Sequence, residues 1–146
     1  MNINYRILLA DDDNDDCLFF SEVLDELPIN TTLHTVNNGV NLMDYLSNTT
    51  NQLPQILFLD LNMPLKDGTE CLSDIRKNKN LADLKVIIIS TSLNMDIVNS
   101  LYDKGADYYI CKPAEFSKLK KVIHQAIEKS SLDEYQKPLI TEFVLQ

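Results

Sequence analysis

Near the start of this chain, five carboxylates within six positions follow directly on a run of apolar residues. The apolar run covers residues 7–10, and residues 11–16 read Asp-Asp-Asp-Asn-Asp-Asp. A buried strand ending in so much negative charge is unfavourable unless a cation is held there, because repulsion and desolvation would force some carboxyl groups to take up protons. Carboxylate oxygens are good ligands for Mg²⁺. We therefore expect Asp11 and Asp12 to bind a divalent metal ion.

The later acids of this run suit the first turn of a helix, where negative charge is favoured. We expect Asp15 and Asp16 to be solvated acids in that turn. Pro28 is expected to end the helix. The buried face of the helix is indicated by an apolar series at helical spacing, namely Cys17, Phe20, Val23, Leu24 and Leu27.

Length and charge narrow the possible classes of protein. The 146 residues suffice for one domain with a sizeable core. The net charge of −9 argues against binding to nucleic acid or to an anionic membrane surface. Residues 1–6 do not resemble a signal peptide, and no apolar run approaches the length that spans a membrane. The three widely spaced cysteines are typical of core residues in a reducing compartment, so we expect a cytoplasmic protein.

Short apolar runs alternate with amphipathic stretches along the chain, which indicates βα units and a parallel sheet. The β-branched run at residues 85–90 should be central, and the more polar run at 33–36 should lie at or near an edge. A polar loop is expected over residues 48–53, and the last helix over residues 116–129. Five strands are predicted, at residues 5–10, 33–36, 55–60, 85–90 and 107–111.

The segment after the last predicted helix is polar at first and then apolar. Residues 138–145 contain five large apolar side chains, which are unfavourable in water. We expect this extension to contact the last helix or a second copy of the chain.

Polar side chains follow four of the predicted strands. In an open parallel sheet, ligands bind beyond the carboxyl ends of the strands, so groups that follow different strands meet there. Three carboxylates, a hydroxyl and an ammonium group are therefore expected at one edge: Asp11, Asp12, Asp60, Ser90 and Lys112.

This set of groups suits phosphoryl transfer. Carboxylates hold a divalent cation and leave ligand positions open, and an aspartate can act as the nucleophile toward an activated phosphoryl group. The reaction mainly requires positioning and neutralisation of the phosphoryl oxygens, which Mg²⁺, Lys112 and Ser90 would provide.

Four segments carry a resemblance to a known family. They read ILLADDD at residues 7–13, FLDLNMPLKDG at 58–68, IISTS at 88–92 and GADYYICKP at 105–113. In this order and spacing they resemble the CheY-like receiver domain of two-component response regulators. The resemblance implies a flavodoxin-like (βα)5 fold, a doubly wound α/β structure whose five-stranded parallel sheet has the order 2-1-3-4-5. It covers residues 1–129 as a receiver domain and leaves 130–146 as a C-terminal extension without a separate output domain.

The resemblance also assigns roles at the site. It implies that Asp60 is the phosphoacceptor and that Mg²⁺ is held by Asp11, Asp12, Asp60 and the backbone carbonyl of Asn62. Lys112 would pair with the phosphoryl group. Asn62 and Ser92 occupy positions that tune self-dephosphorylation in this family.

Two further positions concern switching. The resemblance implies that the hydroxyl of Ser90 moves toward the phosphoryl group and that Tyr109 is an aromatic residue that turns inward on activation. A plain core role for Tyr109 is the alternative, since this strand needs apolar filling. The Lys112–Pro113 peptide resembles a bond that is usually cis in the family.

The expected function is that of a stand-alone response regulator in a two-component phosphorelay, not an enzyme. A sensor histidine kinase or phosphotransfer protein would donate the phosphoryl group to Asp60, and a downstream protein would bind the changed surface. A homodimer through the fourth helix, fifth strand and fifth helix, or through the extension, is possible. The loop at 48–53 and residues 78–84 resemble the single-domain subgroup that includes phytochrome-associated response regulators.

Three other functions compete with this one. A phosphate-independent receiver-like scaffold would not need the acid, hydroxyl and lysine set. A haloacid-dehalogenase-type phosphatase has a second acid two residues after its nucleophile, where this chain has Asn62. A flavodoxin-like electron carrier needs a phosphate cradle after the first strand, where residues 11–16 would repel flavin phosphate.

Overall fold

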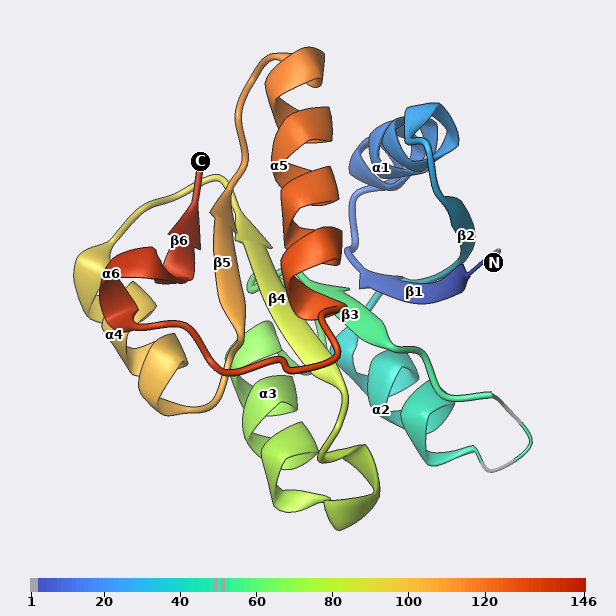
Figure 1. Ribbon diagram of the computed structural model, residues 1–146. Coiled ribbons are helices and arrows are strands. Elements are labelled where there is room, and N and C mark those ends of the chain that lie inside the picture. The colour runs from blue at the N-terminus through green and yellow to red at the C-terminus, as the bar shows by residue number, and fades with distance from the viewer. Residues whose placement is uncertain (1–2, 49, 51) are drawn as a thin grey trace.

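The fold is a six-stranded parallel sheet with helices on both faces (Figure 1). The computed structural model describes residues 3–48, 50 and 52–146. The strand order is β2-β1-β3-β4-β5-β6, and every neighbouring pair is parallel. The expected order 2-1-3-4-5 is therefore confirmed, and one further strand is added next to β5.

The elements follow one another as βα units. The strands are β1 (Asn4–Ala10), β2 (Asn30–Val36), β3 (Ile56–Leu59), β4 (Lys85–Ser90), β5 (Tyr108–Cys111) and β6 (Val144–Leu145). The helices are α1 (Asn14–Glu26), α2 (Gly39–Ser47), α3 (Gly68–Lys77), α4 (Met95–Asp103), α5 (Phe116–Ser130) and α6 (Ile140–Phe143), with a 3₁₀ turn, η1, at Lys79–Leu81. The polar loop expected at 48–53 includes residues 49 and 51, which lie outside the described residues.

Polar side chains fix where the helices begin. Asp13 caps α1 by accepting hydrogen bonds from the backbone N–H groups of Asp15 and Asp16. Asp67 and Glu70 form a reciprocal capping box at the start of α3. Gly105 follows α4 with a φ of 104°, a backbone conformation that favours glycine. The caps of α1 and α3 set loops at the carboxyl edge of the sheet, where the polar groups lie, whereas Gly105 lies in the loop that enters the amino end of β5.

Two hydrophobic cores lie on the two faces of the sheet. Alternate strand residues point to opposite faces, so Leu57 and Leu59 pack with α2, α3 and α4, whereas Ile56 and Phe58 pack with α1 and α5. Figure 1 shows the same division of the helices. All four residues of β3 are buried, as expected for a central parallel strand, and β2 lies at an edge with a more exposed pattern.

The C-terminal extension, residues 130–146, completes the sheet. Val144 pairs with Tyr109 and Leu145 with Ile110, so β6 covers the edge of β5 that would otherwise expose unpaired backbone groups. α6 packs on α4. The extension contacts the last helix, as expected, only through the core that Leu145 shares with α5. Its main contacts are with α4 and β5, which the sequence did not predict.

Hydrogen bonds anchor the segment that leads to α6. The Tyr135 hydroxyl donates to Asp107 Oδ1 at 2.6 Å, and the Tyr102 hydroxyl donates to the Pro138 carbonyl at 2.6 Å. Figure 1 shows this segment crossing from the end of α5 past β5 to α6. The extension is thus tied to the amino end of β5 and to α4.

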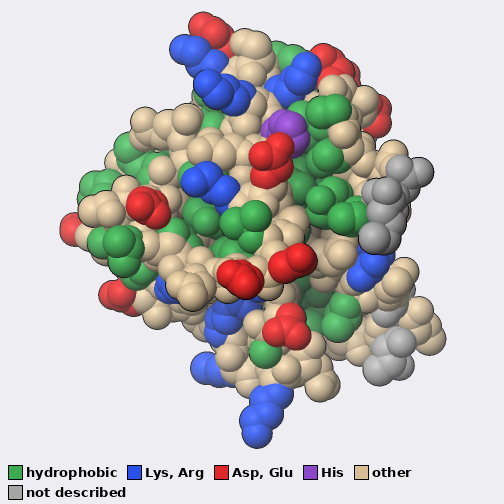
Figure 2. Space-filling view, in the orientation of Figure 1, with side chains coloured by type: hydrophobic (Ala, Val, Ile, Leu, Met, Phe, Trp, Pro, Cys, Tyr) green, Lys and Arg blue, Asp and Glu red, His purple; other side chains and the backbone are tan. Residues whose placement is uncertain are grey.

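The surface carries both signs of charge. Figure 2 shows acidic and basic side chains interspersed on the face seen in Figure 1, with basic side chains grouped over the upper end of α5. Lys118 and Lys120 lie in α5 and form ion pairs with Glu115 and Glu26. Among the described residues, no helix has the length and apolar character needed to cross a membrane.

Candidate functional site

The acidic residues predicted at the carboxyl edge of the sheet lie together. The backbone N–H of Asp60 donates to the Ala10 carbonyl at 3.0 Å, which aligns the ends of β1 and β3. Carboxylate oxygens of Asp11, Asp12 and Asp60 lie within 4.8 Å of one another. This cluster contains the three carboxylates that the sequence predicted as metal ligands.

Without a bound cation, three ionised carboxylates in this partly buried cluster are energetically unfavourable. The pKa of Asp60 is raised to about 6, chiefly by burial and also by the charge of Asp11, while the Lys112 charge and the hydrogen bond from the Asn62 backbone amide oppose the shift. The pKa of Asp11, which is 3% exposed, is also raised by burial, although a hydrogen bond from the Asp13 backbone N–H opposes this. Three crowded oxygen ligands suit a hard divalent cation, which would relieve the repulsion. The residues present therefore fit Mg²⁺, and the Asn62 carbonyl as a fourth ligand stays a prediction.

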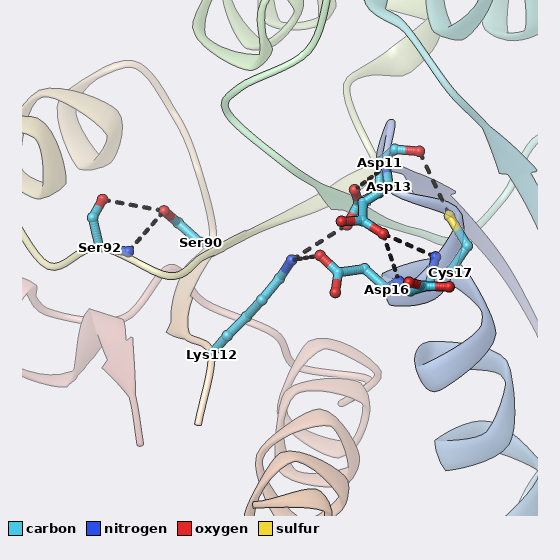
Figure 3. A network of polar contacts seen from close by, with 8 residues as sticks. Asp11, Asp13, Asp16, Cys17, Ser90, Ser92 and Lys112 are labelled. Carbon is cyan, nitrogen blue, oxygen red and sulfur yellow. Dashed lines mark hydrogen bonds and ion pairs between the residues drawn. The ribbon is translucent and has the colours of Figure 1, made fainter. Parts of the chain in front are cut away.

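Lys112 reaches the cluster from the loop after β5. Its Nζ atom lies 3.3 Å from Asp11 Oδ2 and 2.9 Å from Asp16 Oδ2 (Figure 3). Burial alone would lower the pKa of Lys112, but the hydrogen bond to Asp16 and the charges of Asp11, Asp16 and Asp60 raise it above its ordinary value. The lysine is therefore a firmly charged group at the site, close enough to Asp60 to affect the pKa of that carboxyl group.

The contact with Asp16 corrects the expectation that this residue is only a solvated first-turn acid. The Asp16 side chain is 41% exposed, yet of the two carboxylates paired with Lys112 it is the one closer to the ammonium group. The reason is the position of the first turn of α1, which lies beside the loop after β5 in the folded chain. Sequence reasoning missed this partner because Lys112 lies 96 positions away. The only local signal was that an acid in that turn lies at the same sheet edge as Asp11.

Ser90 lies at the end of β4 and is almost fully buried. The Ser92 backbone N–H donates to Ser90 Oγ at 3.2 Å, and the two hydroxyl oxygens are 3.3 Å apart (Figure 3). The backbone N–H of Lys112 donates to the Ser90 carbonyl at 2.7 Å, which ties the loop after β5 to β4. The Ser90 hydroxyl is thus engaged with the loop after β4.

Tyr109 points inward in this structure. Its side chain is fully buried, and its hydroxyl donates to the Ser92 carbonyl at 2.5 Å. The ring lies 6.4 Å from the ring of Phe143 in the C-terminal extension, a neighbour that the sequence did not reveal. An inward ring is compatible with both roles considered for this residue, so its switch role stays a prediction.

The Lys112–Pro113 peptide bond differs from the expectation. It is trans, because no cis peptide bond occurs among the described residues. A bond before proline still favours trans, by about 0.5–1 kcal/mol, so the trans form needs no special support.

Comparisons with known proteins show the family to which this chain belongs. The family model described as the response regulator receiver domain matches residues 7–124, so the chain belongs to this family, whose members act in two-component signalling. The response regulator Rcp1 of Synechocystis sp. is 32% identical over 131 residues, which cover 87% of this chain and 88% of that protein.

Two solved structures are similar over nearly their whole length. The phosphorylated cyanobacterial phytochrome response regulator RcpA matches with a TM-score of 0.80 and 31% identity, over 94% of this chain and 100% of that one. The Mn²⁺-bound form of Rcp1 matches with a TM-score of 0.77 and 31% identity, over 92% and 99% of the two chains. Of these two proteins, RcpA is named as a phytochrome response regulator, the subgroup that the sequence resembles.

Proposed function

We propose that this protein is a cytoplasmic response regulator that accepts a phosphoryl group on Asp60 from a sensor histidine kinase or phosphotransfer protein. The observation that carries the proposal is the convergence of Asp11, Asp12, Asp60 and Lys112 at the carboxyl edge of the sheet. The likeness to RcpA and Rcp1 supports a kinase of the phytochrome-associated type as the donor.

Asp60 supplies the nucleophile. Its carboxyl group is ionised for the most part at pH 7, since its pKa is about 6. A carboxylate oxygen of Asp60 attacks the phosphorus of a phosphohistidine, the new O–P bond forms as the P–N bond breaks, and the released imidazole nitrogen takes up a proton. The product on this chain is an aspartyl phosphate.

The surrounding residues neutralise and orient the transferred group. Asp11, Asp12, Asp60 and the carbonyl of Asn62 would hold Mg²⁺, which neutralises phosphoryl oxygens when it is bound. Lys112 supplies a second positive charge from the carboxyl end of β5, at the same edge of the sheet. Ser90 offers a hydroxyl donor once its contact with Ser92 is released.

The same residues connect the site to a surface. Ser92 is hydrogen-bonded to the hydroxyls of both Ser90 and Tyr109, so a movement of Ser90 toward the phosphoryl group would disturb the loop that leads into α4. Output then depends on a downstream protein that binds the changed surface. Since α6 and β6 cover parts of α4 and β5, that surface would include the C-terminal extension.

Labelling with acetyl phosphate tests the proposal. Wild-type protein with Mg²⁺ should form an acid-stable, base-labile phosphoprotein, and the Asp60→Asn variant should form none. Asp25→Asn, which removes an exposed acid from α1, is the matched control and should label like wild type. Undiminished labelling of Asp60→Asn would contradict the assignment, and a wild-type protein that never labels would favour the phosphate-independent scaffold.

A further inference from the structure

The ammonium group of Lys112 has two carboxylate partners, and neither belongs to Asp60. Asp16 Oδ2 lies at 2.9 Å and Asp11 Oδ2 at 3.3 Å (Figure 3). No ion pair between Lys112 and Asp60 is found among the described residues. The Lys112 side chain is 15% exposed, so little water competes for its donors. The closest partner of this lysine is therefore a residue outside the predicted phosphoacceptor and metal-ligand set.

Asp16 is separate from the metal cluster. The three acids whose oxygens converge are Asp11, Asp12 and Asp60. A divalent cation bound there would engage the Asp11 carboxylate, which is the other partner of Lys112. Asp16 would keep its oxygen for the lysine, so the contact between Asp16 and Lys112 does not depend on an empty metal cluster.

The backbone of Asp16 is held in place. Its N–H donates to Asp13 Oδ1 at 3.2 Å as part of the cap of α1. From this first turn the side chain points at the Lys112 ammonium group (Figure 3). Asp15, one position earlier, is exposed, and its carboxylate forms no ion pair among the described residues, so the two neighbouring acids differ in this contact.

A phosphoryl group on Asp60 would compete for the same ammonium group. To contact the phosphoryl oxygens, Lys112 must leave Asp16 or share its donors with it, and the contact with Asp16 is weakened in either case. The carboxylate of Asp16 also adds negative charge beside a site that gains negative charge on phosphorylation. Both effects favour the unphosphorylated state.

We propose that Asp16 is a positioning residue that holds Lys112 away from Asp60 and thereby lowers the affinity of the site for a phosphoryl group. This inference rests on the proposed function, because it concerns the same phosphoacceptor. Asp16 sets how firmly the lysine is retained before transfer, without contacting the reacting atoms itself.

Beryllofluoride is a suitable probe, because with a carboxylate it forms a tetrahedral adduct similar in shape to an aspartyl phosphate. Its affinity in the presence of Mg²⁺ can be followed through amide NMR shifts. Asp16→Asn should raise the affinity about two- to five-fold, the size expected for loss of a partly exposed ion pair. Asp15→Asn removes the same charge one position away and should leave the affinity unchanged.

A second pair of variants shows whether the effect passes through the lysine. In a Lys112→Ala background, Asp16→Asn should raise the beryllofluoride affinity by a smaller factor than it does with Lys112 present, because the competition for the lysine has been removed and only the effect of the Asp16 charge remains. Thermal unfolding of all variants distinguishes the proposed role of Asp16 from a purely structural one. A purely structural role would lower the melting temperature of Asp16→Asn without changing its beryllofluoride affinity relative to Asp15→Asn.

The outcomes are distinguishable. An Asp16→Asn affinity equal to that of Asp15→Asn, or weaker binding by Asp16→Asn, overturns the inference and leaves the proposed function intact. The inference is also overturned if Asp16→Asn raises the beryllofluoride affinity by the same factor in the presence and in the absence of Lys112. A wild-type protein that binds no beryllofluoride with Mg²⁺ contradicts the proposed function itself.

Discussion

The ring of Phe143 lies 6.4 Å from the ring of Tyr109, and both side chains are fully buried. Tyr102 of α4 packs edge-on against Phe143 at 5.1 Å. Because the Tyr109 hydroxyl is bonded to the Ser92 carbonyl, Tyr109 contacts the C-terminal extension with its ring and the loop after β4 with its hydroxyl. The extension is therefore part of the environment of the proposed switch residue.

Phe143→Ala should strongly reduce the stability of the whole domain. Removing a fully buried phenylalanine leaves a cavity and costs roughly 3–5 kcal/mol in the free energy of unfolding. Leu139→Ala, at a side chain that is 68% exposed, is the control and should change that free energy by less than about 0.5 kcal/mol. Urea denaturation of both variants measures this, and equal stabilities would show that the extension does not contribute to the core.

Asp60→Asn should stabilise the metal-free protein at neutral pH. The pKa of Asp60 is about 6 in the folded protein against an ordinary value of 3.8, so between these pH values the folded state binds more protons than the unfolded chain. The free energy of unfolding therefore falls as the pH rises from about 4 to 6. Asp60→Asn lacks this loss, so its free energy of unfolding should exceed that of the wild type by about 1–2 kcal/mol at pH 7 and by little at pH 4.

Denaturation in EDTA across this pH range checks the prediction, with Asp25→Asn as the control for a general charge effect. A stability difference between Asp60→Asn and wild type that does not change with pH would contradict the assigned pKa shift.

Mg²⁺ should stabilise the protein more at pH 7 than at pH 5. The ion binds the carboxylate form, and Asp60 is largely protonated below its pKa of about 6. An ion that binds only the folded state raises the melting temperature, and the rise grows with the logarithm of the affinity. Asp12→Asn should reduce this effect and Asp15→Asn should retain it, because only Asp12 belongs to the cluster. Thermal shifts with Mg²⁺ at both pH values provide the measurement.

The residues found from the sequence are those whose position follows from topology alone. Asp11 and Asp60 come directly after buried strands, and parallel strands end at one edge, so their proximity requires no knowledge of side-chain packing. Ser90 and Lys112 were located at that edge in the same way. The order of the five main strands followed from the family resemblance.

The features missed depend on contacts that topology does not determine. Asp16 looked like any acid in a first helical turn, and only the placement of α1 beside the loop after β5 gives it Lys112 as a partner. β6 contains two residues, too few for an alternating pattern to be visible. Its pairing depends on the path of the extension past the amino end of β5, which is fixed by contacts such as that of Tyr135 with Asp107.

Tyr135→Phe should loosen the extension while leaving the rest of the fold in place. The Tyr135 hydroxyl donates to Asp107 Oδ1 at 2.6 Å, and Asp107 Oδ2 accepts from Arg76 at 2.9 Å and from the Val86 backbone N–H at 2.7 Å. Burial and the bond to Asp107 raise the pKa of Tyr135, so its hydroxyl stays protonated and donates. Losing a hydrogen bond to a charged, buried acceptor costs about 1.5–3 kcal/mol.

The loss should appear first where the extension is attached. Hydrogen exchange of the β6 amides should accelerate in Tyr135→Phe more than exchange in β3, because local opening of the extension becomes easier than global unfolding. Tyr5→Phe is the control, since no hydrogen bond from the Tyr5 hydroxyl is found among the described residues. Unchanged exchange in β6 would mean that Phe143 and the strand pairing hold the extension without Tyr135, because the fully buried ring and the β5–β6 hydrogen bonds would then suffice.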